Sequence, residues 1–275
     1  MRSPFDANYH SHTVRCGHAT GQDEQYVEEA IQAGFKVLGF SDHIMIPGIN
    51  QPRIRGNFEL LDDYINSVNK LKKQYKDSIE IHLGFEAEWF GEEMAEYYRD
   101  LLESKKIEYL IQGQHCFLAD GSLHWYDEAG PTREDFVNAY VRDLLAGMRS
   151  GLFTYVCHPD MFIRWLPGYW NEQAEKVSYQ IAEEAKRLHI PLEINMGMIN
   201  FHPERPIGEE GLLIYPYIRF WEIVKEVGAD AILGVDAHTP DTYRYAEYEK
   251  VMEFAKKVGV NLLSRVKFPH FGETK

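Results

Sequence analysis

The chain has 275 residues, and its 29 basic and 43 acidic side chains give a formal net charge of −14. A surface this acidic cannot bind nucleic acid by releasing counterions from its phosphates, and anionic membranes repel it. We therefore expect neither nucleic acid nor a membrane as a partner. No apolar run is long enough to span a bilayer or to form a signal peptide. Three cysteines, an odd and small number, argue against a disulfide framework. We therefore expect a cytoplasmic protein of undetermined oligomeric state.

Short apolar runs alternate with longer segments of helical periodicity along the whole chain. The pattern predicts strands at residues 7–10, 35–41, 79–85, 109–113, 153–157, 191–195 and 231–235. It predicts helices at residues 24–33, 59–75, 92–104, 134–149, 171–188, 216–227 and 245–258. About seven such units indicate an α/β fold with a closed parallel barrel, as one domain over residues 1–275. A doubly wound open sheet is the alternative, although no Gly-x-Gly-x-x-Gly turn follows a strand.

Polar residues of metal-ligating type follow each predicted strand, at the face where active sites of β/α barrels lie. These residues occur in His10-Ser11-His12, Ser41-Asp42-His43, Glu86-Ala87-Glu88, Gln114-His115, His158-Pro159-Asp160, Glu193 to Asn195, and Asp236-Ala237-His238. Each histidine alone has an equally ordinary interpretation as a hydrogen-bonded core residue. Their recurrence at successive strand ends predicts a metal site instead. His82 and His189 lie away from these ends and are expected to be structural.

The types of ligand limit the choice of metal. Imidazole and carboxylate groups suit zinc, iron or manganese, and the lack of a thiolate cluster argues against a purely structural zinc site. Side chains two residues apart on a strand point to the same side, so His10 and His12 can share an ion, as can Asp236 and His238. Nine ligating groups are too many for one ion and fit two or three.

The order of these motifs resembles that of the polymerase and histidinol phosphatase (PHP) superfamily, over nearly the whole chain. The matching segments are Tyr9-His10-Ser11-His12-Thr13 with His18, Phe40-Ser41-Asp42-His43, Gly84-Phe85-Glu86, His115, His158-Pro159-Asp160 and Asp236-Ala237-His238. The chain is most similar to the histidinol-phosphate phosphatases within that superfamily. Two neighbouring residues depart from its pattern, Asn8 and Val235, and neither is a ligand.

The resemblance implies a distorted (β/α)7 TIM-like barrel with three divalent ions at the C-terminal ends of the strands. One ion would be bound by His10, His12, Glu86 and Asp236. A second would share Glu86 and add His115 and His158, and a third would be bound by His18, His43 and His238. Glu88 would orient a ligand or contact the substrate.

The expected reaction is hydrolysis of L-histidinol phosphate to L-histidinol and phosphate, a step of histidine biosynthesis, by a hydroxide that bridges two ions. Three ions, two carboxylates and a hydroxide carry a formal charge of about +3, which favours a phosphate monoester. Asp42 or Asp160 would act as an acid–base group, or would orient a neighbouring histidine. Arg164 and Arg205 are expected to bind the phosphate, and His202 is a weaker candidate. The segment His124 to Glu128 would recognise the substrate or form a lid.

Three other functions remain open at this point. The same scaffold serves a phosphoesterase acting on a nucleotide, a phosphodiester or phosphotyrosine. A non-catalytic or exonuclease-like accessory module of a polymerase is the second, and the negative charge weighs against it. An amidohydrolase-type barrel is the third, although such barrels tend to use a bridging lysine, and no lysine stands at a predicted strand end.

Overall fold

A computed structural model describes residues 3–166, 170–204 and 215–271. Its main sheet has eight strands, paired in chain order, and every neighbouring pair is parallel. The strands are β1 (Ala7–Asn8), β2 (Val37–Phe40), β3 (Glu80–Ala87), β4 (Tyr109–Gln112), β7 (Tyr155–Val156), β8 (Leu192–Asn195), β9 (Asp230–Gly234) and β10 (Asn261–Leu262). The predicted parallel α/β barrel is confirmed, with β10 as a short strand that the apolar pattern did not indicate.

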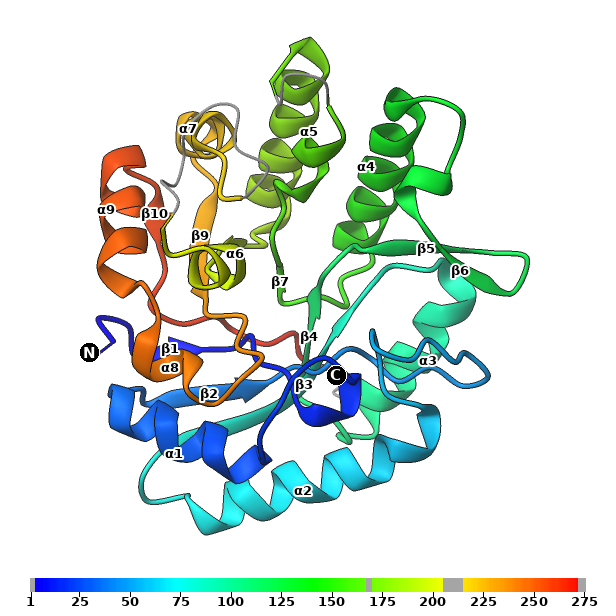
Figure 1. The fold of residues 1–275 in the computed structure, drawn as a ribbon. Coiled ribbons are helices and arrows are strands. Elements are labelled where there is room, and N and C mark those ends of the chain that lie inside the picture. Colours follow the sequence, from blue (N-terminus) through cyan, green and yellow to red (C-terminus); the bar gives the residue numbers. More distant parts are fainter. Residues whose placement is uncertain (1–2, 167–169, 205–214, 272–275) are drawn as a thin grey trace.

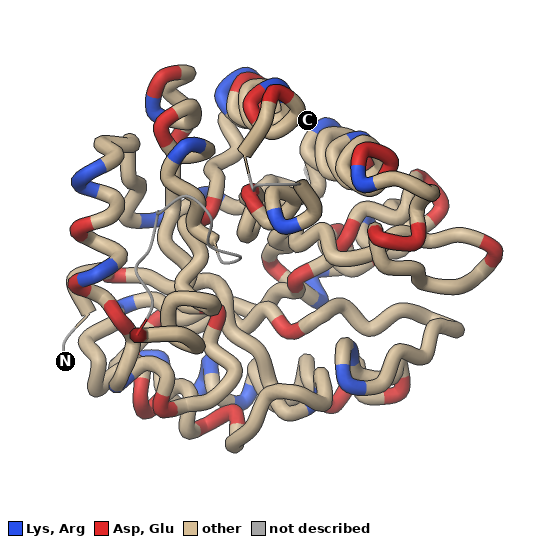
Figure 2. Tube along the Cα trace, turned by 45° about the horizontal axis from the view of Figure 1, so that its top comes forward, with Lys and Arg blue, Asp and Glu red and all other residues tan. Residues whose placement is uncertain are grey.

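The longer helices surround the curled sheet on its outer side, whereas two short ones, α6 (Gly197–Phe201) and α8 (Thr242–Tyr245), lie at the C-terminal end of the barrel (Figure 1). The longer ones are α1 (Asp23–Ala33), α2 (Leu61–Gln74), α3 (Glu92–Glu103), α4 (Arg133–Arg149), α5 (Glu172–Leu188), α7 (Ile218–Val227) and α9 (Tyr248–Val258). Lysine, arginine, aspartate and glutamate are interspersed along the outer helices (Figure 2). Among the described residues, no helix combines the length and apolar character needed to cross a membrane.

Helix α2 illustrates how the sequence produces this arrangement. Its buried residues, Leu61, Tyr64, Val68 and Leu71, recur every three or four positions and form one apolar face against the sheet. Acidic residues occupy its first turn and basic residues its last, which complements the helix dipole. The strands themselves are almost wholly buried, as expected for a parallel sheet covered on both faces.

The residues that follow β1 and β9 contact each other and so close the sheet into a barrel. The His12 N–H donates to the carbonyl of Ala237 at 2.9 Å. The Asn8 amide reinforces this closure, because its Oδ1 accepts from the N–H of Val235 at 2.9 Å and its Nδ2 donates to the carbonyl of His10 at 2.9 Å. An aspartate at this position would lack the donor, so the asparagine suits the closure.

Apolar side chains fill the opposite end of the barrel. A buried cluster around Tyr9, Tyr109 and Tyr155 occupies its interior. The C-terminal segment packs beneath this cluster, and the Phe268 ring stacks on Tyr109 with ring centroids 4.9 Å apart. The Phe268 ring also meets Tyr9 edge to face at 5.8 Å. The N-terminal end of the barrel is therefore closed by apolar side chains, and polar side chains gather at the other end.

An antiparallel hairpin interrupts the alternation of strands and helices between β4 and α4. It consists of β5 (Cys116–Ala119) and β6 (Ser122–Trp125), followed by a 3₁₀ turn. The periodicity predicted no strands here, because each strand has only four residues. Tyr126 anchors the hairpin in the core: its hydroxyl donates to Asp143 at 2.9 Å and accepts from Gln114 at 2.8 Å.

Candidate metal centre

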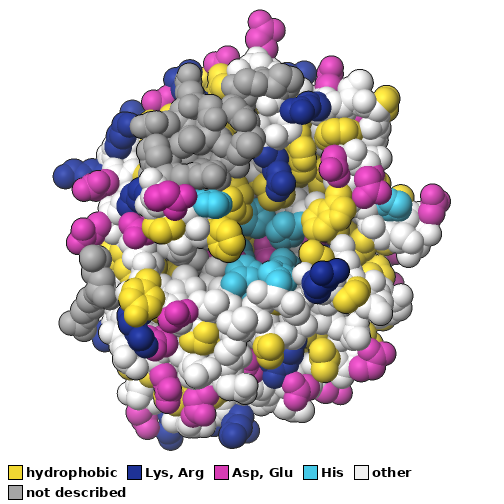
Figure 3. Space-filling model, in the orientation of Figure 1, with side chains coloured by type: hydrophobic (Ala, Val, Ile, Leu, Met, Phe, Trp, Pro, Cys, Tyr) yellow, Lys and Arg dark blue, Asp and Glu magenta, His cyan; other side chains and the backbone are white. Residues whose placement is uncertain are grey.

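The side chains that follow the strands converge at the C-terminal end of the barrel. Figure 3 shows histidine side chains gathered in a hollow on this face, with an acidic side chain between them. The hollow has a volume of about 690 Å³. Eight of the nine predicted ligands line it: His12, His18, His43, Glu86, His115, His158, Asp236 and His238. The ninth, His10, is fully buried beside them.

Four of these side chains direct one atom each toward a common point. The Nε2 atom of His12 lies 3.2 Å from His10 Nε2 and 3.1 Å from Asp236 Oδ1. Glu86 Oε2 lies 3.5 Å from both imidazole nitrogens. Ligands bound tetrahedrally to zinc at 2.0–2.2 Å are about 3.4 Å apart. The spacing of the four atoms therefore fits a single ion between them.

The second oxygen of Glu86 faces a different pair of histidines. Glu86 Oε1 lies 2.9 Å from His158 Nε2 and 3.5 Å from His115 Nε2. The ring of His43 contributes from the side, with its Nδ1 3.2 Å from Glu86 Oε2. One carboxylate thus joins two groups of ligand-type atoms.

The three remaining histidines form a third group nearer the mouth of the hollow. His18 Nε2 lies 3.0 Å from His238 Nε2, and the His18 and His43 ring centroids are 5.4 Å apart. The structure therefore brings all nine residues together at one end of the barrel, and it places His43 close to Glu86 and His115 as well as to His12 and His238. Their role as metal ligands stays a prediction.

Carboxylates behind the cluster face the outer nitrogen of three of its histidines. His10 Nδ1 lies 3.0 Å from Glu193, and His115 Nδ1 lies 3.2 Å from Glu88 Oε1. His12 Nδ1 lies 3.6 Å from Asp42. A proton on Nδ1 leaves the Nε2 lone pair free to bind an ion. Sequence reasoning gave Glu193 no role, although a glutamate inside a wholly buried strand was a usable signal.

Burial and mutual charge set the protonation of the cluster. Burial alone would raise the pKa of Glu86, but His115, His43 and His10 hold it well below its ordinary value. Burial lowers the pKa of His43, and it lowers that of His238 to about 4. Glu86 is therefore ionised and these two imidazoles are neutral near pH 7, which is the state in which each type of side chain binds a cation.

The buried polar atoms of the cluster fit a bound cation. Among the described residues, His43 Nδ1 and Asp236 Oδ1 are buried without a hydrogen-bond partner, and such atoms are costly unless something satisfies them. Two ligand-type residues also have left-handed backbone, His158 at φ +32° and Asp236 at φ +52°. Strain of this kind in residues other than glycine concentrates at functional sites. Histidine, glutamate and aspartate donors together have the chemistry of a divalent metal site.

A glycine on the neighbouring strand makes room for the shared carboxylate. A Cβ atom on Gly113 would lie 1.8 Å from Glu86 Oε1, far inside van der Waals contact. Gly234 has the same relation to Glu193, whose Oε2 would lie 2.1 Å from its Cβ. The buried carboxylates occupy space that these glycines leave open.

The contacts of three residues bear on their predicted roles. Asp160 is buried, and its Oδ2 accepts from the Tyr217 N–H at 2.7 Å and from Trp221 Nε1 at 3.2 Å, so it anchors the start of α7 rather than serving a histidine or the substrate. Glu88 is fully buried behind His115, so the predicted substrate contact gives way to the alternative of orienting a ligand. Asp42 is also fully buried, and its contacts with His12 and the His43 N–H fit orientation rather than acid–base chemistry.

The predicted phosphate-binding residues lie in different places. Arg164 is exposed and lines the hollow. His202 is half-buried, 3.5 Å from Glu204, and is not part of the hollow's lining. Arg205 lies outside the described residues. The predicted recognition segment, His124 to Glu128, meets the hollow only in part. Trp125 lines the hollow, whereas His124 pairs with Glu128 at 3.0 Å.

A family model for the PHP domain matches residues 8–197. The chain belongs to the PHP domain family. This PHP domain is 26% identical over 261 residues to a probable histidinol-phosphatase of Deinococcus radiodurans, covering 88% of this chain and 90% of the relative. It is 25% identical to a probable histidinol-phosphatase of Schizosaccharomyces pombe, covering 94% and 88%.

The fold of this PHP domain is shared with a solved histidinol phosphate phosphatase from Lactococcus lactis. The two superpose with a TM-score of 0.68 at 19% identity, over 95% of this chain and 98% of the other. The Lactococcus crystal structure holds zinc, L-histidinol and phosphate. The resemblance that the motif order suggested is confirmed at the level of family and fold.

Zinc binding to this PHP domain is expected to release protons and to strengthen from about pH 7 to about pH 9. Burial alone lowers the pKa of His12, but the nearby carboxylates of Asp236, Asp42 and Glu86 raise it to about 9. That proton must leave before His12 Nε2 can bind an ion. Calorimetry of the chelator-treated protein in buffers of different ionisation enthalpy counts the protons. A count of zero at about pH 7 would contradict the expectation.

Asp160 is expected to make the protein less stable as the pH rises. Burial raises the pKa of Asp160 to about 7, so the folded chain keeps a proton that the unfolded chain releases near pH 4. The free energy of unfolding therefore falls between about pH 4 and about pH 7, by up to about 4 kcal/mol from this group. Asp160→Asn retains an oxygen for both N–H bonds and should remove that part of the fall. Denaturant titrations of both proteins at about pH 5 and about pH 8 measure it, and an unchanged pH dependence would refute it.

Proposed function

We propose that this chain is a metal-dependent phosphatase that hydrolyses L-histidinol phosphate to L-histidinol and phosphate. The single observation that supports this most is the convergence of nine ligand-type residues, Glu86 among them, at the C-terminal end of the barrel. The names of the two relatives, each matched over most of its length, support the substrate. The zinc, histidinol and phosphate in the Lactococcus enzyme support the same reaction.

Three groups of residues would hold three divalent ions, with zinc favoured by the Lactococcus structure. The first group is His10, His12, Glu86 and Asp236, the second is Glu86, His115 and His158, and the third is His18, His43 and His238. When bound, such ions lower the pKa of water and neutralise charge on the phosphoryl oxygens.

The chain's own side chains prepare the site for that chemistry. Asp42, Glu88 and Glu193 each face an Nδ1 atom and so aim the opposite nitrogen of a histidine into the hollow. Arg164 supplies a guanidinium at the wall, where it can bind two phosphate oxygens in parallel. This local positive charge serves an anionic substrate in a protein whose net charge is −14.

The outer wall of the hollow suits the alcohol part of the substrate. Its apolar members include Ile54, Trp125, Met161, Met198 and Phe201. Trp125 and Phe201 are large aromatic side chains with 43% and 79% of their surface exposed. An imidazole ring can pack against an indole face, and a hollow of about 690 Å³ is of the size that binds small molecules.

The proposed substrate is tested by phosphate release from a panel of compounds. The zinc-loaded protein is expected to cleave L-histidinol phosphate with a higher kcat/KM than glycerol phosphate, a nucleoside monophosphate, phosphotyrosine or a phosphodiester. Equal rates across the monoesters would leave a phosphatase of another substrate, and preference for the diester would favour a phosphodiesterase. No turnover of any compound by protein with its full complement of zinc would refute the proposed activity.

Two variants are expected to separate binding of the phosphate from binding of the alcohol. Arg164→Met removes charge-assisted hydrogen bonds and should lower kcat/KM for every monoester by about 10- to 100-fold. Trp125→Ala should lower it about 5-fold for L-histidinol phosphate, because one aromatic contact contributes about 1 kcal/mol. It should leave glycerol phosphate unaffected. Steady-state kinetics with both substrates measures this, and the same loss on both substrates in Trp125→Ala would show that the indole has no part in specificity.

A further inference from the structure

The Arg55 side chain is an unusual feature outside the predicted site. It is 1% exposed, and it is among the largest fully buried side chains of the described residues. Arginine is rarely buried unless it is paired, because removing a guanidinium from water costs several kcal/mol. Its burial therefore calls for a reason beyond packing.

All three arms of the guanidinium are used. Nε donates to Gln51 Oε1 at 2.8 Å, and Nη1 donates to the carbonyl of Ile44 at 3.1 Å. Nη2 donates to Glu88 Oε1 at 2.9 Å, and neither side chain of this ion pair is exposed. The Phe90 ring covers the guanidinium at 5.9 Å. Arg55 is thus held in one orientation by the loop that follows β2.

The same oxygen of Glu88 faces the candidate metal centre. Glu88 Oε1 lies 3.2 Å from His115 Nδ1, and the opposite nitrogen of His115 lies 3.5 Å from Glu86 Oε1. A continuous line of contacts therefore runs from Arg55 through Glu88 to His115. An ionised Glu88 accepts the Nδ1 proton and leaves the His115 Nε2 lone pair directed into the hollow.

The other two carboxylates behind the cluster are fastened differently. Asp42 accepts from the Thr13 hydroxyl and from the His43 N–H, and Glu193 accepts from the Asn195 amide at 2.6 Å. Across residues 3–166, 170–204 and 215–271, Glu88 alone of the three has a guanidinium for a partner.

We propose that Arg55 is a positioning residue of the metal centre: its guanidinium holds the Glu88 carboxylate in place, and Glu88 in turn sets the orientation of His115. This inference rests on the proposed function, because it takes His115 as a ligand. Arg55 belongs to the same loop as Ile54, which lines the hollow. The loop therefore contributes both to the wall of the site and to its ligand geometry.

The test compares Arg55→Met, Glu88→Gln and the double variant with the unmodified protein. Loss of an outer partner typically lowers metal affinity 10- to 100-fold, so zinc affinity, measured by competition with a chelator, should fall by about that factor in each single variant. The double variant should be no weaker than either, because both changes break the same line of contacts. In the chelator-treated proteins, ¹⁵N shifts of the His115 ring should show the Nδ1–H form in the unmodified protein and a mixture in Arg55→Met.

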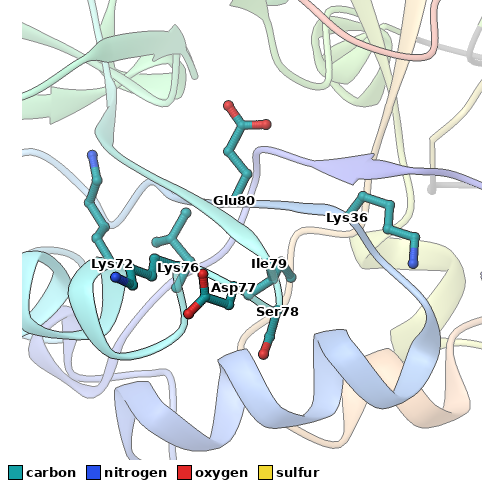
Figure 4. A pocket seen from close by; sticks show the side chains of 8 residues that line it. Lys36, Lys72, Lys76, Asp77, Ser78, Ile79 and Glu80 are labelled. Carbon is teal, nitrogen blue, oxygen red and sulfur yellow. The ribbon is translucent and has the colours of Figure 1, made fainter.

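Lys72→Met is the matched control. Lys72 pairs with Glu108 at 2.5 Å, near a surface pocket with Lys36, Lys76 and Glu80 at the N-terminal end of β3 (Figure 4). Removing this cation also breaks an ion pair but should leave zinc affinity and the His115 ring unchanged.

Three results would overturn the inference: unchanged zinc affinity in Arg55→Met, an unchanged His115 ring form, or losses that add in the double variant. If Arg55→Met does not fold, Arg55→Lys replaces it, since it keeps the charge with a single donor group, and it should lose less than 10-fold. Unmodified protein that binds no zinc would instead refute the proposed function, so the two failures are distinguishable.

Discussion

The buried carboxylate of Glu86 lies among histidines that follow four different strands. Its oxygens are within 3.5 Å of His10, His12, His43, His115 and His158. An ionised carboxylate without water costs several kcal/mol unless positive charge or hydrogen-bond donors surround it. The barrel meets this demand by bringing the ends of β1, β2, β4 and β7 toward β3. Fold and chemistry therefore depend on the same contact, because the strand order that closes the sheet also supplies the partners of one carboxylate.

Much of the fold follows from local pattern. The seven strands of the main sheet other than β10, and the longer helices between them, were predictable, because apolar runs and helical periodicity are properties of neighbouring residues. The hairpin and β10 were not. Strand β10 has two residues and pairs only with β9, and the hairpin is stabilised by the distant contact of Tyr126 with Asp143. Elements of this kind depend on tertiary contacts that no window of sequence contains.

The candidate site was likewise predictable in part from the sequence. The ligand-type residues could be found because they stand directly after strands, two residues apart or beside a proline. The residues that orient them could not be ranked, because Glu193, Asp42 and Asp160 look alike in sequence and differ only in what they face. Arg55 had no signal at all. Its role depends on a fold that places a loop residue against a glutamate 33 positions away.

The apolar side chains that close the N-terminal end of the barrel have a consequence for the kinetics. Tyr109 and Phe268 close that end, so in the described part of the chain the hollow is reached from the C-terminal end of the barrel. Substrate enters and both products leave by the same route. With the proposed substrate, the phosphate would lie beside the ligand-type residues and the alcohol would lie toward Trp125, which lines the hollow. In the proposed reaction the alcohol would therefore leave first and the anion last, and free phosphate would compete with incoming substrate at the base of the hollow.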